Sequence, residues 1–570
     1  MKKKIGVYIC HCGGNISDYV DVEKVRQAVE NEGGVLLAKT TMFACSDSNQ
    51  KDMVDDIKNN DLDGIVVASC SPKLHLTTFR NVSERAGLNK YNYVHANIRE
   101  QASWAHSDDK AGATEKAIQL VKAAIAKDRF AKSLESNVIN AQKAVAVIGG
   151  GIAGMKAAMA LSDMDCPVYI IEREHAVGGR VAQWGALFTT NETGKDLIAR
   201  LHKELIGREN VTIFTGAEVV ENKGSIGDFK LKVKIAPLGE ILDVNVGSVL
   251  MATGFDSYTP EDGEFGFNLI DNVVTLPDFK EMIEDCTDKL MYKGNEVKNI
   301  AYIYCVGSRQ SEGENTYCSR YCCTSTIHTA LLAKKKFKGI YNYHFTRGVR
   351  TYGKQEVLYA ESSQQGDIYL QSFEDALPDV AKHGDKTIVK INDLLTGGRE
   401  LEVEADLVVL VTGMVPRADN SVGTLFKLPK GRDKFFNEIH MKLRPVETVI
   451  DGVTICGTCQ GPKNIMESVN SALSAATKSY SYVSKGVLET EPIVALIDSG
   501  LCTWCNACSE ACPFDAISMS AEGLKSIAVI NNSVCKGCGM CAPVCPTDAI
   551  DLITYSNNEI ESMIDALANG

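Results

Sequence analysis

Short apolar stretches alternate with amphipathic helical patterns over residues 1–135. The strand candidates are residues 5–9, 64–68 and 91–95, and the helix candidates are residues 21–31 and 113–126. Buried strands give continuous apolar runs, whereas surface helices repeat apolar residues at helical spacing. The alternation predicts a small α/β domain built on a parallel sheet.

A second strand–helix pattern begins with AVAVIGGGIAG, which contains Gly149-x-Gly151-x-x-Gly154. Glycines at these positions let a pyrophosphate approach the N-terminus of the helix that follows. The next apolar strand, Val168–Ile171, ends in Glu172, where a carboxylate can hold a ribose hydroxyl. The pattern predicts a dinucleotide site, and by itself it leaves FAD and NAD open.

Later segments favour FAD. MATGFD and VVLVTGMVP resemble the two crossovers between the FAD and NAD(P)H domains of flavin disulfide reductases, and DGVTICGTCQGPKNI resembles the segment that closes their flavin site. Many of those proteins carry Gly-Asp where this chain has Gly-Thr. The further candidate cofactor contacts are Gly178, Gly179, Arg180, Gly254, Gly457 and Thr458.

Four cysteines stand where such a reductase would bind its nicotinamide nucleotide. The strand at residues 299–304 is present, but no glycine-rich loop follows it. Adjacent cysteines cannot close an unstrained disulfide, and the spacing does not match the paired elbows of a zinc site. We expect a 4Fe-4S cluster in the FAD domain, with structural thiols as the alternative. Its ligands would be Cys305, Cys318, Cys322 and Cys323.

The C-terminal region repeats C-x2-C-x2-C-x3-C-P twice, which is typical of a bacterial two-cluster ferredoxin. The fourth cysteine of each run crosses to the other cluster, and a pair of zinc sites is the alternative. One cluster would use Cys502, Cys505, Cys508 and Cys545, and the other Cys535, Cys538, Cys541 and Cys512. An amphipathic helix at residues 557–567 follows; we expect it to pack on its own domain, with partner docking as the alternative.

Four more cysteines lie near the ends of N-terminal strands, and parallel strands gather these ends at one edge. We expect a fourth cluster there; alternatively, some of these thiols line the cluster of the FAD domain or are redox-inert. The residues are Cys10, Cys12, Cys45 and Cys70. The structural interpretation is preferred for His11, His75, Cys166, Cys286, Cys456 and Cys459.

At 570 residues the chain is too long for one core. We predict an N-terminal domain at 1–135, a thioredoxin-reductase-like FAD domain at 141–485, a ferredoxin domain at 490–555 and a terminal helix at 556–570.

A net charge of −13 argues against nucleic acid or anionic membrane as a partner. The sequence shows neither a signal peptide nor an apolar run long enough to span a membrane, so we expect a cytoplasmic protein. In a reducing cytoplasm we do not expect its twenty cysteines to form disulfides.

The motifs together resemble the A subunit of heterodisulfide reductase, in the same order and over nearly the whole chain. The segments that carry the resemblance are GVYICHCGGNI, VVASCSPKLH, ANIREQASWAH, GGGIAGM, GGRVAQWGALF, CSRYCC, TCQGPKNI and the two ferredoxin runs. The resemblance implies an FAD and iron–sulfur oxidoreductase subunit. Electrons from a hydrogenase, a formate dehydrogenase or a similar donor would be bifurcated at FAD between B- and C-type subunits and ferredoxin, in a dimer of such complexes.

The chain departs from longer members of this family in two ways. Many carry an inserted ferredoxin, but no C-x2-C-x2-C lies between Gly179 and Ala252. Relatives also carry a lysine near the flavin at a position where this chain has His328. A cation near the flavin ring would stabilise reduced, anionic flavin, so a titratable imidazole in its place would alter the flavin potentials. His328 is therefore the candidate catalytic residue, with a packed helix residue as the alternative. A stand-alone NAD(P)H oxidoreductase and an inert scaffold are the alternative functions.

Overall fold

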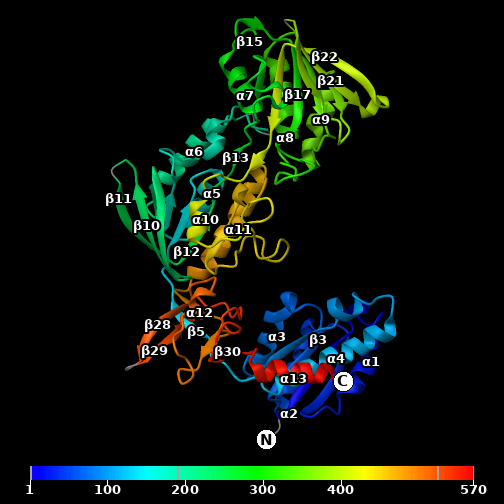
Figure 1. The fold of residues 1–570 in the computed structure, drawn as a ribbon, viewed down its shortest axis with the longest axis vertical. Coiled ribbons are helices and arrows are strands. Elements are labelled where there is room, and N and C mark those ends of the chain that lie inside the picture. The colour runs from blue at the N-terminus through cyan, green and yellow to red at the C-terminus, as the bar shows by residue number, and fades with distance from the viewer. Residues whose placement is uncertain are drawn as a thin grey trace. The chain divides into compact units, whose positions relative to one another are not determined.

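The computed structural model describes residues 3–568 except 189, 191, 238, 385, 523 and 524. The chain forms two compact units, one made of Met1–Val138 with Glu489–Gly570 and the other of Ile139–Leu488 (Figure 1). No helix in the described part of the chain combines the length and apolar character needed to cross a membrane.

The N-terminal part of the first unit is a four-stranded parallel sheet in the order β2-β1-β3-β4. The strands are β1 (Ile5–Cys10), β2 (Val35–Thr41), β3 (Gly64–Ser69) and β4 (Tyr93–Asn97), and the helices are α1 (Val22–Val29), α2 (Asp47–Asn60), α3 (Pro72–Ala86) and α4 (Lys110–Asp128). Every residue of β1 and β3 is buried, as expected for central parallel strands. The predicted α/β fold is confirmed, and all four carboxyl ends meet at one edge.

The C-terminal part of this unit has two short antiparallel ribbons, β27 with β30 and β28 with β29. The ferredoxin-like cysteines lie in the segments that connect these strands. The elements are β27 (Ala495–Ile497), α12 (Ala507–Glu510), β28 (Ile517–Glu522), β29 (Lys525–Ile530), β30 (Ile550–Leu552) and α13 (Asn557–Ala568). Contrary to the prediction, the terminal helix does not pack on the ribbons but alongside α4 (Figure 1). Lys127 of α4 lies over the Tyr555 ring, 3.6 Å from its centroid, which helps to hold α13 there.

The first half of the second unit carries the glycine motif. Its parallel sheet has the order β25-β12-β6-β7-β8, and a three-stranded antiparallel sheet accompanies it. The elements are β6 (Val145–Ile148), α5 (Ile152–Asp163), β7 (Val168–Ile171), α6 (Gly194–Ile206), β8 (Val211–Phe214), β9 (Ala217–Ser225), β10 (Asp228–Ile235), β11 (Glu240–Val246), β12 (Ser248–Met251), β25 (Val453–Ile455) and α11 (Ile465–Val483).

The second half repeats this architecture, with a parallel sheet in the order β14-β23-β17-β18-β19 and a second three-stranded antiparallel sheet. The elements are β14 (Val273–Thr275), α7 (Leu276–Asp285), β17 (Asn299–Val306), α8 (Cys322–Lys336), β18 (Tyr341–Thr346), α9 (Glu356–Gln364), β19 (Ile368–Gln371), β20 (Asp379–His383), β21 (Lys386–Asp393), β22 (Arg399–Ala405) and β23 (Leu407–Thr412). The two chain crossings, β13 (Asp256–Ser257) and β24 (Met414–Val415), pair with each other. The predicted two-domain flavin-reductase fold is confirmed.

Candidate functional site

The glycine loop between β6 and α5 is tightly packed on one side and open on the other. Gly149 has φ of 109°, and a Cβ atom there would lie 2.3 Å from the carbonyl oxygen of Ala252. A Cβ at Gly154 would lie 1.9 Å from the Gly149 carbonyl oxygen. Gly151, in contrast, has no atom within 4 Å of a built Cβ except the Gly179 Cα at 4.0 Å. The first and third glycines therefore allow the loop to pack, while the second keeps space free at the N-terminus of α5.

Glu172 stands at the end of β7 and is 6 % exposed. One carboxylate oxygen accepts the backbone N–H of Gly150 at 2.6 Å, and the other accepts that of Glu174 at 2.9 Å. These bonds fix the carboxylate beside the glycine loop, which is the position that the sequence predicts for a ribose contact.

A cavity of about 830 Å³ opens from this loop toward the second half of the unit. The predicted residues that line it are Gly149, Gly151, Glu172, Gly178, Gly179, Arg180, Gly254, Thr458 and His328. Gly154 and Gly457 do not line it. The free space at Gly151, and an Arg417 Nε that is buried without a hydrogen bond to any described residue, suit the anionic pyrophosphate of FAD. These residues fit FAD.

His328, on α8, borders this cavity and packs edge-on against Phe188, with 5.8 Å between ring centroids. Burial and the neighbouring Lys280 ammonium lower the pKa of His328 to about 4. The imidazole is therefore neutral at neutral pH and brings no positive charge to the cavity at that pH.

Replacing His328 tests this protonation state. In the unfolded chain the His328 imidazole binds a proton below pH 6.5, whereas in the folded chain it does so only near pH 4. The free energy of unfolding therefore decreases as the pH falls through this range. We expect His328→Gln to gain about 2 kcal/mol over the parent at about pH 5, with little difference at neutral pH. Melting followed by release of flavin fluorescence measures it, with the exposed His383→Gln as control. A difference that does not change with pH would mean that His328 is charged in the folded protein.

The nucleotide loop of the second half has been replaced. Cys305, at the end of β17, has φ of 63°, and Gly307 is covered by Tyr258, whose Cγ would lie 2.0 Å from a built Cβ. The next helix, α8, does not follow a short loop but begins at Cys322. A pyrophosphate therefore has neither an open glycine nor an adjacent helix N-terminus at this strand.

The structure brings the four predicted cysteines of this region together. Burial raises the pKa of Cys305 to about 11, and the nearby thiols of Cys323 and Cys318 add to it. A hydrogen bond from Cys322 lowers the pKa of Cys323, whose sulfur also accepts the Arg350 backbone N–H at 3.5 Å. Cys323 is therefore the first of the adjacent pair to become a thiolate, the form that binds iron.

An aromatic pair connects this cysteine group with the cavity. Tyr321 lines the cavity and directly precedes Cys322 in the chain. Its ring stacks on Trp184, with 6.2 Å between centroids and 12° between planes. Tyr321 also packs against the core cluster that contains Cys322 and Cys323, so it lies next to both the cavity and the cysteines.

The ferredoxin-like cysteines divide into two groups in space. A small cavity is lined by Cys502, Cys505, Cys508 and Cys545, the set predicted for one cluster. Around the other group, burial raises the pKa of Cys541 to about 11, and the thiols of Cys535, Cys538 and Cys512 are among its neighbours. The repeat is also visible in hydrogen bonds, since Cys512 accepts the Ala516 N–H and Cys545 the Ala549 N–H, each at 3.3 Å.

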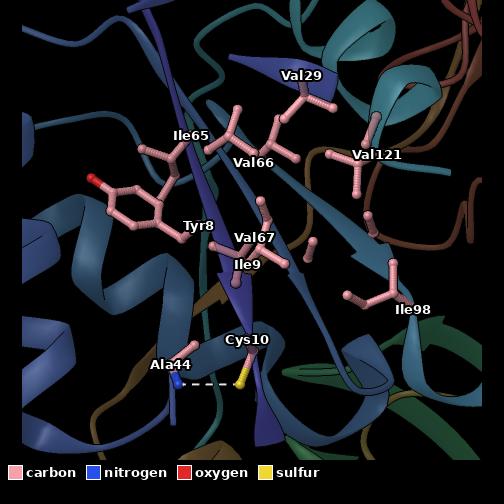
Figure 2. Close-up of a cluster of buried hydrophobic side chains, with 14 of the residues drawn as sticks. Tyr8, Ile9, Cys10, Val29, Ala44, Ile65, Val66, Val67, Ile98 and Val121 are labelled. Atoms are coloured by element: carbon pink, nitrogen blue, oxygen red, sulfur yellow. Dashed lines mark hydrogen bonds between the residues drawn. The ribbon is translucent and has the colours of Figure 1, made fainter. Parts of the chain in front are cut away.

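The N-terminal cysteines meet at the carboxyl edge of their sheet. Figure 2 shows Cys10 at the end of β1 with its sulfur facing the Ala44 amide, which donates at 3.4 Å; the Cys12 amide donates at 3.2 Å. Burial raises the pKa of Cys10, and the thiols of Cys12 and Cys45 contribute. Burial likewise raises the pKa of Cys70 to about 11; Arg99 lowers it, and the thiols of Cys12 and Cys10 raise it. All four predicted cysteines therefore lie near one another.

Across the described residues, no three His, Cys, Asp or Glu side chains are placed to hold a single metal ion. A 4Fe-4S cluster has a different requirement, because its four cysteine sulfurs bind four separate irons. The four groups of thiols meet this requirement as far as residue type and number are concerned.

Cys456 and Cys459, whose C-x2-C spacing resembles that of a redox pair, pack in different parts of the core. Cys456 packs in the core with α5 and α11, whereas Cys459 packs in the core with β9 and β10. The Cys459 thiol points at the Cys456 carbonyl, 3.1 Å away. Sequence reasoning missed Lys280 and Tyr258, because no local motif marks them. It also did not single out Trp184, although this residue lies within the segment GGRVAQWGALF.

Two protein families match parts of the chain. The "4Fe-4S dicluster domain" matches residues 495–552, and "Pyridine nucleotide-disulphide oxidoreductase" matches residues 105–275. The first match supports iron–sulfur clusters, and the second a flavoprotein oxidoreductase.

Curated relatives align along most of the chain. An iron–sulfur A-type subunit of CoB–CoM heterodisulfide reductase from Methanopyrus kandleri is 34% identical over 600 residues, covering 90% of this chain and 91% of the relative. The A-type subunit of H2:CoB-CoM heterodisulfide,ferredoxin reductase from Methanothermobacter marburgensis is 34% identical over 599, covering 90% of each. These alignments exceed the 570 residues of the chain, so the relatives contain segments that are absent here. A solved T. acidophilum thioredoxin reductase is 16% identical with a TM-score of 0.41, covering 59% of this chain and 97% of that one.

Proposed function

The chain belongs to the family of heterodisulfide reductase A subunits, and from this premise we propose that its flavin feeds the cysteine group at Cys305–Cys323. FAD, when bound, exchanges two electrons, whereas each 4Fe-4S cluster exchanges one. The chain is thus a flavin oxidoreductase subunit of a reductase complex, and its flavin lies between a donor and iron–sulfur acceptors.

One observation carries this proposal: four cysteines and Tyr258 occupy the place of a nicotinamide-nucleotide loop. The remaining cavity at this end of the sheet, about 590 Å³, is also unfavourable for a nucleotide phosphate, because carboxylates outnumber Arg347 in its lining. Those carboxylates are Glu264, Glu312, Glu374 and Asp379.

In the proposed sequence of events, the residues of the chain bind FAD, exclude water and conduct electrons. The glycine loop and Glu172 would hold the adenosine end of FAD, and the stacked Tyr321 and Trp184 would cover the cavity wall next to Cys322. We propose four clusters: one at Cys305–Cys323, two in the ferredoxin-like part and one at the N-terminal edge.

The partners follow from the family. We propose B- and C-type subunits, a hydrogenase, formate dehydrogenase or similar donor, and ferredoxin, in a dimer of complexes, with bifurcation at FAD. The names of relatives include H2 and ferredoxin/F420H2 as donors, so the donor varies among members of the family. Cysteines that bind iron have to remain reduced, and we propose a cytoplasmic location for this reason.

The alternative, a stand-alone NAD(P)H oxidoreductase, gives a different result in one experiment. We expect NADH and NADPH to leave the absorbance of bound FAD unchanged in the anaerobic holoprotein, while photoreduction bleaches it and then reduces the clusters. Rapid bleaching by either nucleotide would support the alternative. A flavin that photoreduction cannot bleach would indicate an inert scaffold.

A further inference from the structure

Lys280, on α7, differs from the other basic side chains that line the flavin cavity. Those others have a hydrogen-bond or ion-pair partner: Arg173 with Asp419, Arg180 with Asp256, Arg200 with Glu192, Arg417 with the Thr253 carbonyl and Lys463 with Gln460. Lys280 Nζ makes neither a hydrogen bond nor an ion pair to any residue that the structure describes. Instead it lies near the face of the Trp184 ring, whose centroid is 5.8 Å away.

The surroundings leave this nitrogen positively charged. The titratable groups near it are Glu284, four residues later on the same helix, and His328 on α8. Burial lowers the pKa of Lys280 to about 8, against the attraction of Glu284. At neutral pH the ammonium therefore persists, beside a neutral His328.

The cofactor acquires charge of the opposite sign. Oxidised FAD takes up two electrons and one proton on full reduction, and its ring then carries one negative charge. Because the glycine loop and Glu172 occupy the pyrophosphate and ribose end, the ring is left for the part of the cavity that includes Trp184, His328 and Lys280. An ammonium without a partner stabilises such an anion strongly in a site of low dielectric constant.

We propose that Lys280 is the residue that stabilises the reduced, anionic flavin of this protein, in place of position 328. The inference rests on the proposed function, because it needs FAD in this cavity. The stabilising positive charge would then come from α7 and not from position 328 on α8.

Sulfite is a suitable probe because it needs no partner protein. It adds to N5 of oxidised flavin; an N–S bond forms from the sulfur lone pair, and the ring becomes an anion without any other reductant. We expect Lys280→Met to weaken sulfite binding to the holoprotein by about tenfold, and Lys280→Arg to stay within about threefold of the parent. Glu284→Gln should strengthen binding about threefold, because it removes the opposing carboxylate. Lys293→Met, whose lysine pairs with Asp271 outside the cavity, is the matched control.

Equal sulfite affinity in the parent and in Lys280→Met, with FAD content unchanged, would overturn the proposal. If Lys280→Met does not retain FAD, the proposal is tested with Glu284→Gln instead. Sulfite binding to Glu284→Gln that is unchanged or weaker than in the parent would overturn the proposal. A parent protein that lacks FAD, or whose FAD cannot be photoreduced, contradicts the proposed function itself. If only the role of Lys280 is wrong, bound FAD in the parent protein can still be photoreduced and can still reduce the clusters.

Discussion

Gly151→Ala is expected to abolish FAD binding while leaving the fold and the iron content intact. Gly151 has φ of −72°, which alanine adopts freely, and its built Cβ meets nothing closer than 4.0 Å. The added methyl group would instead occupy the space through which a pyrophosphate approaches α5. We expect FAD to bind at least about 100-fold more weakly, or about 3 kcal/mol. Flavin per chain after desalting, and fluorescence titration, measure this loss.

Two further glycine variants define the comparison. Gly207→Ala changes an ordinary helix end outside the cavity and should retain FAD. Gly154→Ala places a Cβ 1.9 Å from a backbone oxygen, so we expect it to disrupt the β6–α5 packing as well as FAD binding. Normal FAD content in Gly151→Ala would place the dinucleotide elsewhere.

Cys322→Ser is expected to lose about four iron atoms per chain and to retain FAD. Cys322 is 1 % exposed and opens α8, directly after Tyr321 in the chain. Without this ligand the cluster is lost, and photoreduced flavin should reduce the ferredoxin-like clusters at least about 100-fold more slowly, because the intermediate carrier is missing. Iron analysis and anaerobic rapid-mixing absorbance measure the two effects.

Cys166→Ser is the matched control for that experiment. Cys166 is 0 % exposed, so the substitution has a similar burial cost, but it belongs to a core without the other predicted ligands. We expect its iron content to equal that of the parent. Equal iron content in Cys322→Ser and the parent would mean that the four cysteines are structural thiols.

Motifs made of neighbouring residues could be predicted from sequence. The glycine loop, Glu172 and the paired ferredoxin runs are set by local spacing. In the structure Glu172 lies beside the glycine loop, and Cys502, Cys505, Cys508 and Cys545 line one small cavity. The parallel N-terminal sheet also made the gathering of Cys10 and Cys70 predictable, because parallel strands end at one edge.

Features that depend on tertiary packing were not predictable in this way. Tyr258 covers Gly307 from a distant segment, and Lys280 reaches the flavin cavity from α7 without any motif around it. The charge state of His328 depends on its burial and on Lys280, neither of which the local sequence specifies. The terminal helix α13 packs on α4. Its apolar spacing predicts an amphipathic helix but does not specify which element covers the apolar face.

Iron and flavin per chain in anaerobically purified protein, with EPR of the reduced form, test the central claim most directly. We expect about sixteen iron atoms and one FAD, corresponding to four 4Fe-4S clusters that include the group at Cys305–Cys323. About eight iron atoms in intact protein, together with rapid bleaching of the flavin by NADH, would confine the clusters to the ferredoxin-like part. That result would contradict the account and favour a nicotinamide oxidoreductase.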